Sequence, residues 1–406
     1  MHLLFHSTKH NCIFSTIIMG TDEIRVTARA PVNIAVIKYW GKSNMDLKIP
    51  SNDSISATLN MDDMCTKTTV HTSPEFERDR FWLNGLEQDI TQSESLVQII
   101  LQDIKRVSNL DREILNQKVN IISCNNFPTA AGLASSAAGY ACLAYALGNA
   151  YGVTDRTILS KVARKGSGSA CRSIYGGFVH WMKGICHETS LAKQIADHTH
   201  WPELRLVVCI VNENQKDVSS SQGMSRSVDS SSLIKYRSDV VVPERIKRME
   251  KAVLEKDFGT FAELTMMDSN QFHAICLDTY PPIFYLNDTS RHIIRICTLI
   301  NNYYECPIVA YTFDAGPNAC IFMLDKHVLR VVDIIRKFFP LVDNSNKISD
   351  IPIRGQVGSL ASSAQDKSLE DFLKSNGVLP RPNSINYIIS TSVGSGPTLI
   401  DEHLSV

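Results

Sequence analysis

A loop of small residues in the middle of the chain is the first candidate for chemistry. Residues 128–139 read Pro-Thr-Ala-Ala-Gly-Leu-Ala-Ser-Ser-Ala-Ala-Gly and follow a predicted strand at 119–123. Small residues let the backbone approach a ligand closely, and the first turn of a helix offers phosphate oxygens unpaired N–H groups and a positive dipole end. The loop is neither a Walker A motif nor a dinucleotide fingerprint. Composition alone supports a phosphate cradle and a tightly packed small-residue helix about equally.

Two further segments carry groups suited to anions or hydroxyls. Residues 165–172 read Lys-Gly-Ser-Gly-Ser-Ala-Cys-Arg, so backbone donors, hydroxyls and the planar guanidinium of Arg172 can meet a diphosphate or a carboxylate. Asp314 ends an apolar strand just before a Gly-Pro turn, where a carboxylate can orient or deprotonate a hydroxyl. Ordinary alternatives remain, because a flexible surface loop explains the first segment and an Asx turn explains Asp314.

The elements that must position these residues are a mixture of strands and helices. Period-two patterns and short apolar runs predict strands within 23–37 and at 55–59, 67–71, 119–123, 206–211, 309–313 and 319–324, and the Asn-Gly pair in 81–86 predicts a tight hairpin. Helical spacing predicts helices at 93–107, from about 135 to 148–152, near 244–275 and at 288–301. Hairpins interspersed with helices predict an α+β fold in two lobes.

Length and charge limit the classes of protein that fit. The chain has 406 residues, 44% of them hydrophobic and 20% charged, with a formal net charge of −1. This length exceeds one ordinary core and predicts an N-terminal lobe at 21–202 and a C-terminal lobe at 203–401. Near-neutral charge argues against nucleic-acid and membrane-surface partners, which usually require a basic patch.

Cysteine usage and hydropathy indicate a cytosolic protein. The eleven cysteines are scattered without a C-x-x-C pair, which favours reduced thiols over disulfides or a zinc site, and we expect no metal site built from side chains. The chain has no run of about 18 apolar residues, so we expect no membrane-spanning helix. Residues 1–20 make a poor signal peptide, and we expect them to be a disordered extension.

Four stretches of the sequence carry a family pattern. They are residues 30–42 (Ala-Pro-Val-Asn-Ile-Ala-Val-Ile-Lys-Tyr-Trp-Gly-Lys), 128–139, 166–172 and 313–319. Together they resemble the diphosphomevalonate decarboxylase family of the GHMP kinase superfamily, from about Ile24 to Ile400. The resemblance implies an N-terminal lobe similar to a ribosomal-protein domain, a C-terminal α/β sandwich lobe and an active-site cleft between them.

The reaction that this resemblance implies is an ATP-dependent decarboxylation of (R)-5-diphosphomevalonate. ATP, with Mg²⁺ bound through its phosphates, would phosphorylate the tertiary hydroxyl. Loss of that phosphate with carbon dioxide would leave isopentenyl diphosphate, a precursor of isoprenoids and sterols. Phosphate leaves far more readily than hydroxide and the carboxylate supplies the electrons, so the chemistry requires no pyridoxal phosphate, thiamine or metal electron sink.

The family pattern also implies roles for individual residues. Asp314 matches the base or orienter of the reacting hydroxyl, and Arg172 matches the ligand of the substrate carboxylate. Lys38 would bring positive charge to the transferring phosphoryl group, and Ser136 would position phosphates. The expected substrate contacts are Tyr39, Trp40, Gly41, Lys42, Ser167, Gly168, Ser169, Ala170, Cys171, Arg172 and Ser221. The expected nucleotide contacts are Pro128, Ala130, Ala131, Gly132, Leu133, Ala134, Ser135 and Ser136.

The sequence departs from the family pattern in one place. Family members often carry an arginine about ten residues beyond the hairpin at 82–85, whereas residues 93–95 here read Ser-Glu-Ser. This departure bears on substrate affinity rather than on reaction type. The family also implies a homodimer, and the serine-rich loop around Ser221 is expected to close over the ligands.

Two other functions share part of the pattern. A GHMP small-molecule kinase without decarboxylation would use the same phosphate loop, but residues 38–42 and 167–172 are not expected together in it. A nucleotide-binding, non-catalytic homologue would have lost Asp314, Lys38 or Arg172, and the chain keeps all three.

Overall fold

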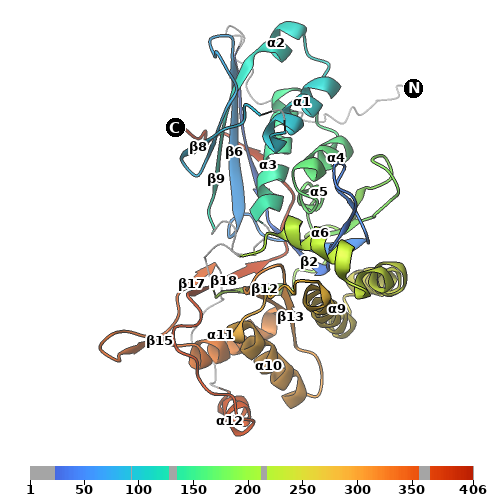
Figure 1. Cartoon of the computed structure of the whole chain (residues 1–406). Coiled ribbons are helices and arrows are strands. Elements are labelled where there is room, and N and C mark those ends of the chain that lie inside the picture. The colour runs from blue at the N-terminus through green and yellow to red at the C-terminus, as the bar shows by residue number, and fades with distance from the viewer. Residues whose placement is uncertain (1–22, 93, 128–134, 212–216, 356–365, 406) are drawn as a thin grey trace, which may run out of the picture.

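The computed structural model describes residues 23–92, 94–127, 135–211, 217–355 and 366–405. The predictions for residues 1–20 and for the loop at 128–134 therefore lie outside the described residues. The chain forms two stacked parts, each with its own sheet and helices (Figure 1). The predicted α+β class is confirmed.

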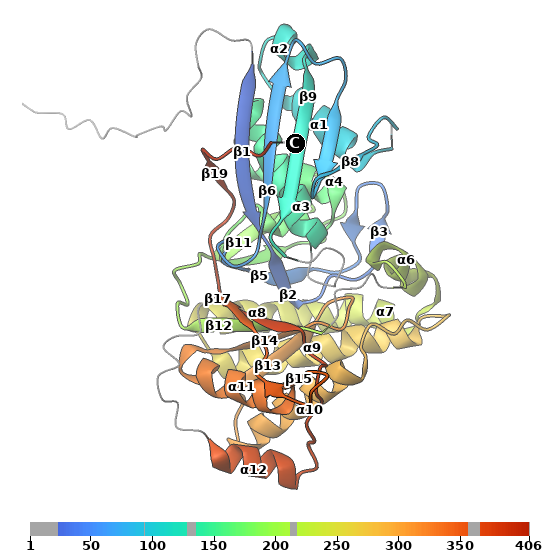
Figure 2. The same cartoon turned by 90° about the vertical axis from the view of Figure 1, so that its left-hand side faces the viewer.

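The upper part of the molecule is built on a six-stranded sheet with one helical face. In sheet order its strands are β19 (Thr398–Ile400), β1 (Ile24–Pro31), β6 (Cys65–Ser73), β9 (Lys118–Asn125), β7 (Arg80–Leu83) and β8 (Leu86–Gln88). The helices on its inner face are α1 (Leu96–Val107), α3 (Ser135–Ala150) and α4 (Arg156–Gly166), and α2 (Arg112–Asn116) lies at the top (Figure 2). The predicted Asn-Gly hairpin joins β7 to β8, with Asn84 and Gly85 at φ 51° and 81°.

A second, four-stranded sheet lies between the upper and lower parts. In order its strands are β11 (Ala192–Ala196), β10 (Phe178–Trp181), β5 (Ser54–Thr58) and β2 (Asn33–Ile37). A short ribbon of β3 (Lys42–Asn44) and β4 (Ile49–Pro50) follows β2, and the short helix α5 (Ala170–Ser173) packs beside the sheet.

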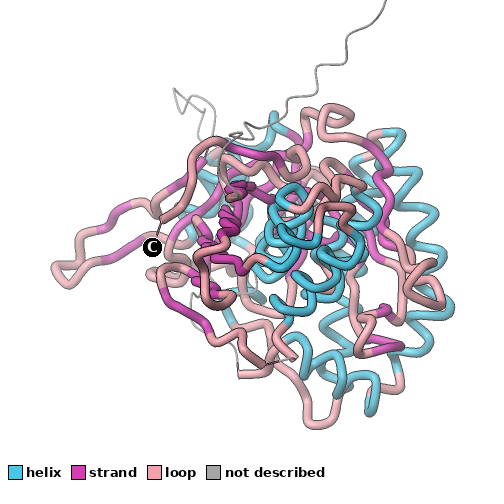
Figure 3. Tube along the Cα trace, turned by 90° about the horizontal axis from the view of Figure 1, so that it is seen from above, coloured by secondary structure: helices cyan, strands magenta, loops and turns pink. Residues whose placement is uncertain are grey.

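The lower part contains a five-stranded sheet and most of the remaining helices. Its strands in order are β13 (Val309–Phe313), β14 (Ala319–Leu324), β12 (Leu204–Ile210), β18 (Tyr387–Ser392) and β17 (Ile353–Gly355). Its helices are α6 (Ser220–Ser230), α7 (Leu233–Tyr236), the π-helix η1 (Arg237–Val241), α8 (Val242–Glu255), α9 (Phe258–Asp278), α10 (Asp288–Tyr303), α11 (Asp325–Phe338) and α12 (Lys367–Ser375). The ribbon of β15 (Leu341–Val342) and β16 (Ile348–Ser349) projects from this part, and helices crowd one side of the molecule when it is seen from above (Figure 3).

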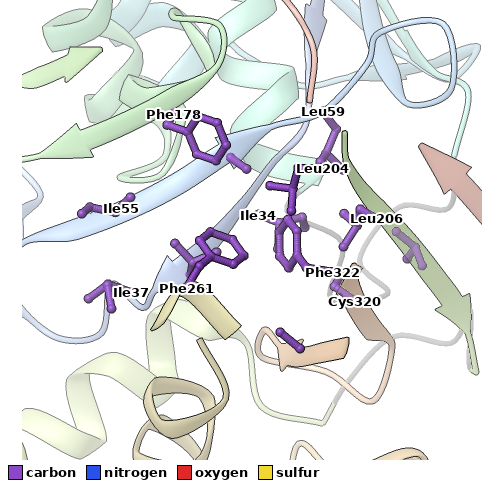
Figure 4. Close-up of a cluster of buried hydrophobic side chains, with 14 of the residues drawn as sticks. Ile34, Ile37, Ile55, Leu59, Phe178, Leu204, Leu206, Phe261, Cys320 and Phe322 are labelled. Atoms are coloured by element: carbon purple, nitrogen blue, oxygen red, sulfur yellow. The ribbon is translucent and has the colours of Figure 1, made fainter. Parts of the chain in front are cut away.

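One hydrophobic core joins the two parts. Ile34 and Ile55 from the middle sheet meet Leu206 and Phe322 from the lower sheet, with Phe261 of α9 between them (Figure 4). These side chains are essentially excluded from solvent, so separating the parts would expose apolar surface at a cost of about 25 cal/mol per Å². This shared core fixes the end of β2 relative to the end of β13, the two strands that carry the residues of the site.

Candidate active site

A cavity of about 330 Å³ lies where the upper and lower parts meet. Most of the predicted site residues line it: Lys38, Tyr39, Trp40, Lys42, Ser135, Ser136, Ser167, Gly168, Ser169, Arg172, Ser221 and Asp314. They come from the segments that follow β2 and β13, from the start of β3 and of α3, from α5 and the loop before it, and from α6. Segments far apart in sequence therefore converge on one cavity, as the motifs predicted.

The centre of the cavity holds an ion pair between the two parts. Lys38 directly follows β2 and Asp314 directly follows β13, and Lys38 Nζ lies 2.7 Å from Asp314 Oδ1. The lysine side chain is 3% exposed and the aspartate 24%, so the ammonium is enclosed while the carboxylate faces the cavity. The Phe313 N–H donates to Ser269 Oγ at 3.1 Å, which fixes the strand end that carries Asp314. A hydroxyl entering the cavity would meet a carboxylate already oriented by a cation.

The backbone of Lys38 is held by a second aspartate. Its N–H donates to Asp268 Oδ2 at 2.7 Å, and its carbonyl accepts from Arg237 Nη2 at 3.0 Å. Asp268 is fully buried and also accepts from Arg245 at 2.8 Å. Burial raises the pKa of Asp268, but the Arg237 and Arg245 guanidiniums and the Lys38 N–H outweigh burial and hold the pKa below its ordinary value. The cluster fixes the strand end that presents the lysine side chain.

The guanidinium of Arg172 is buried beside the cavity. Its Nε donates to Ser56 Oγ at 2.9 Å and to Asn33 Oδ1 at 3.3 Å, and its Cζ lies 5.6 Å from the Trp181 ring centre. Its Nη1 is buried and has no hydrogen-bond partner among the described residues. Burial lowers the pKa of this group. A buried donor without a partner is costly, so the arrangement is suited to an anion that completes it.

The start of α3 faces the cavity beside the loop that begins at Ser167. Ser136 is exposed, and its Oγ lies 3.1 Å from Ser167 Oγ, whereas Ala137 and Ala138 behind it are buried. The small residues therefore serve helix packing on one side, and the first turn stays open on the other. This geometry is compatible with both alternatives for the small residues, a phosphate-binding first turn and a tightly packed helix.

The sequences of known proteins identify the family. A model of the diphosphomevalonate decarboxylase-like N-terminal domain matches residues 30–192, and a model of the mevalonate 5-diphosphate decarboxylase C-terminal domain matches residues 206–400. The diphosphomevalonate decarboxylase of Rattus norvegicus is 48% identical over 394 residues, which cover 94% of this chain and 94% of that protein. The chain belongs to the diphosphomevalonate decarboxylase family.

Solved structures of decarboxylases of this family have the same fold. The mevalonate diphosphate decarboxylase from Trypanosoma brucei superposes with a TM-score of 0.79 at 37% identity, covering 93% of this chain and 98% of that one. A structure described as MDDEF in complex with MVAPP, AMPPCP and magnesium gives a TM-score of 0.70 at 31% identity, covering 94% of this chain and 100% of that one. Family membership makes this chain an enzyme of the decarboxylase kind.

Some residues predicted from the family pattern lie beside the cavity without lining it. Gly41, Ala170 and Cys171 are absent from the lining. Gly41 has φ 86° and lets the chain turn towards β3, while Ala170 and Cys171 are buried in α5. Burial raises the pKa of the Cys171 thiol to about 12, which keeps it protonated. Their contact with substrate stays a prediction. Pro128, Ala130, Ala131, Gly132, Leu133 and Ala134 lie outside the described residues.

The family pattern also missed residues that line the cavity. Lys48, Leu96 and Tyr140 lie on its wall. Phe272 also lines the cavity, and it belongs to residues 269–273, a further stretch that resembles the family, although no contact was assigned to it. Leu96 and Tyr140 sit in helices where their apolar spacing indicated only packing, and Lys48 stands between strands in a stretch without a motif. Asn33 lies within the family motif at 30–42, which was the one signal that singled it out.

The described residues show no sign of a metal site, a disulfide or a membrane-spanning helix. In that part of the chain, no three His, Cys, Asp or Glu side chains gather closely enough to bind a metal ion, and the ten described cysteines are all free. None of the described helices combines the length and hydropathy that a bilayer crossing requires.

Proposed function

We propose that this protein catalyses the ATP-dependent decarboxylation of (R)-5-diphosphomevalonate to isopentenyl diphosphate, with release of ADP, phosphate and carbon dioxide. The observation that carries the proposal is the Lys38–Asp314 pair, held at 2.7 Å in a cavity that Arg172 also lines. A carboxylate, an ammonium and a guanidinium in one enclosed space suit a substrate that is a hydroxy acid carrying phosphate. The reaction would supply isoprenoid and sterol precursors.

The first half of the reaction is a phosphoryl transfer. The tertiary hydroxyl attacks the γ-phosphorus of ATP while Asp314 takes the hydroxyl proton, and the bond from that phosphorus to the bridging oxygen breaks to leave ADP. Lys38 keeps Asp314 in place and carries positive charge close to the transferring group. Ser136 and the first turn of α3 supply donors for the nucleotide phosphates, to which Mg²⁺ is bound.

The second half uses the new phosphate as a leaving group. The C–O bond breaks, positive charge builds at the tertiary carbon, and the bond to the carboxylate carbon cleaves so that its electron pair forms the C=C bond. Arg172, whose buried Nη1 has no partner in the part of the chain that the structure describes, orients the carboxylate for this cleavage. The remaining wall, with Tyr39, Lys42 and Ser167, contacts the diphosphate.

Product analysis tests this proposal. Purified protein with magnesium-ATP and diphosphomevalonate should release carbon dioxide and inorganic phosphate in equal amounts. ADP together with a stable 3-phosphorylated product, and no carbon dioxide, would instead identify a GHMP kinase. Binding of nucleotide with no turnover of either kind would identify a non-catalytic homologue.

We further propose that the protein is a cytosolic homodimer. Reduced thiols fit the cytosol, and the ten described cysteines form no disulfide among themselves. The dimer is an expectation from the family. Sedimentation velocity of the full chain should give a single species near twice the chain mass of 45.3 kDa, and a species at the chain mass would contradict the dimer.

A further inference from the structure

The cavity carries much more positive charge than the rest of the chain. Its lining includes four cations, Lys38, Lys42, Lys48 and Arg172, against one carboxylate, Asp314, although the formal net charge of the whole protein is −1. Lys38 is paired with Asp314, and Arg172 is held by Ser56 and Asn33. Lys42 and Lys48 have no carboxylate partner within the part of the chain that the structure describes. Two enclosed ammonium groups are therefore left for a ligand to neutralise.

Lys48 is placed in the cavity by the ribbon of β3 and β4. It directly precedes β4 with φ 50°, and the turn before it is closed by the Leu47 N–H donating to Asn44 Oδ1 at 2.8 Å. Lys48 Nζ donates to the Gly166 carbonyl oxygen at 2.7 Å. An ammonium has three N–H donors and this carbonyl takes one, so two remain for a ligand beside the Ser167–Ser169 segment.

The electrostatics of the two lysines fit an anion of high charge. Burial and, to a smaller extent, the nearby positive charge of Lys42 together lower the pKa of Lys48 to about 8. Burial also lowers the pKa of Lys42. A bound diphosphate would offset both effects by restoring counter-charge to the two ammonium groups.

A structural explanation of Lys48 has to be separated from a ligand-binding one. Gly166 is the last residue of α4, and a cation near a helix C-terminus stabilises the exposed carbonyls and the helix dipole. That role would explain the bond to Gly166. It would not explain why the side chain also lines the cavity beside Lys42.

We propose that Lys48 is a substrate-binding residue that, with Lys42, binds the diphosphate end of the substrate rather than the phosphates of ATP. The placement favours the substrate, because Lys48 contacts the segment that runs from Gly166 to Arg172, the residue assigned to the substrate carboxylate. This inference rests on the proposed function. It adds a residue that no motif indicated, and it makes substrate affinity dependent on pH.

Steady-state kinetics of Lys48→Gln test the assignment. A charge-assisted hydrogen bond contributes enough binding energy that KM for diphosphomevalonate should rise on the order of 10–100-fold. KM for ATP should stay within about twofold, and kcat should change little, because the lost contact is remote from the reacting carbon. Lys48→Arg should recover most of the affinity. Lys193→Gln, on the exposed strand β11, is the matched control.

The pH profile gives a second readout that a purely structural lysine would not move. Lys48 is cationic below its pKa of about 8 in the free enzyme, so wild-type kcat/KM for diphosphomevalonate should fall as pH rises through that value. In Lys48→Gln this alkaline decline should be weaker. Calorimetric titration with inorganic diphosphate, which does not depend on turnover, should show weaker binding to the variant.

The outcomes separate this inference from the proposed function. An unchanged KM for diphosphomevalonate in Lys48→Gln, or an equal rise in KM for ATP, would overturn the substrate-binding role of Lys48. A lower melting temperature with unchanged KM would assign Lys48 to capping α4 instead. Absence of carbon dioxide release from the wild type would reject the proposed function, whereas the diphosphate titration would still report on Lys48.

Discussion

Lys38 contacts two aspartates from the lower part of the molecule, and these aspartates differ in solvent exposure and in their hydrogen-bond partners. Asp314 receives the side-chain ammonium, is 24% exposed, and has its other oxygen without a hydrogen-bond partner among the described residues. Asp268 receives the backbone N–H, is 0% exposed, and is surrounded by Arg237 and Arg245. Asp268, whose oxygens all accept hydrogen bonds, thus holds the backbone of Lys38. The ammonium of Lys38 is paired with Asp314, which still has an oxygen available to accept a hydrogen bond.

The difference shows that one buried carboxylate can serve to fix the structure while the other stays available for the reaction. A fully buried carboxylate that is completely satisfied by guanidiniums has no capacity left for a substrate and serves to fix geometry. A carboxylate with one partner and one free oxygen keeps the capacity to accept a proton. If this division is right, mutations at the two aspartates should separate activity from stability.

The largest effect is expected from Asp314→Asn. The amide keeps the size of the side chain but cannot take the hydroxyl proton, so kcat should fall by about 10²–10⁴-fold. Stability should fall less than in Asp268→Asn, because one cation rather than two loses its counter-charge and that cation lies beside the cavity. Rapid-quench assays of carbon dioxide and phosphate measure the loss, and calorimetry should still detect substrate binding. Activity close to that of the wild type would remove Asp314 from its proposed role.

The second largest effect is expected from Asp268→Asn, and it should appear in stability. Removing the charge leaves Arg237 and Arg245 buried without a counter-charge, which typically costs about 3–5 kcal/mol. Thermal and urea unfolding of the full chain measure the loss. Asp62→Asn, an exposed partner of Arg29 at 71% side-chain exposure, is the control and should stay within about 0.5 kcal/mol. Equal stability of Asp268→Asn and the control would break the comparison.

Arg172→Gln tests a group that combines features of both aspartates. Arg172 is as buried as Asp268, yet its Nη1 has no partner within the described ranges, as expected for a group that completes its bonds with substrate. We expect kcat/KM for diphosphomevalonate to fall by about 10–100-fold, since a hydrogen bond to a charged group contributes about 1.5–3 kcal/mol. KM for ATP is the internal control. An unchanged kcat/KM would contradict the assignment.

The positions of Lys38 and Asp314 at strand ends could be predicted because their neighbours in the sequence carry the signal. Asp314 follows an apolar strand and precedes a Gly-Pro turn, and Lys38 follows another apolar strand, so both strand ends could be located. Helical and alternating patterns likewise located most of β1, β6, β9, α3 and α10 to within a few residues. Local periodicity is strong in these segments because each buries one continuous face.

Contacts between distant segments were not predictable in the same way. Asp268 lies in the middle of α9, directly before residues 269–273, which resemble the family pattern. Its importance comes from the arginines that fold against it, which the sequence did not indicate. Lys48 reads as an ordinary surface lysine until the ribbon of β3 and β4 places it on the cavity wall with Leu96. Leu96, which directly follows the Ser-Glu-Ser of residues 93–95, lines the same cavity as Lys48.

The smallest effect is expected at His180, a third charged contact between the two parts of the molecule. Its Nε2 lies 3.0 Å from Asp53 Oδ2 and its Nδ1 lies 2.8 Å from Glu250 Oε1 on α8, while the Lys183 N–H donates to Asp53. Burial lowers the pKa of His180, but Asp53 and Glu250 outweigh burial and leave the pKa above its ordinary value. Unlike Asp268, a histidine has an ordinary pKa of about 6.5, and in the folded protein the pKa of His180 lies above it.

The sign of the pH dependence follows from that raised pKa. Protonated His180 stabilises the folded state fully below the unfolded pKa of about 6.5, and the contribution disappears as pH rises through the higher folded value. The wild type should therefore lose stability relative to His180→Gln as pH rises from about 6.5 through the higher folded pKa, by less than the loss from Asp268→Asn. Thermal unfolding of both proteins across this range measures the difference. His71→Gln, which removes a histidine paired with Glu23 on the upper sheet alone, is the matched control. A constant difference between wild type and His180→Gln across this range would mean that His180 joins the two parts as a neutral hydrogen-bonding group.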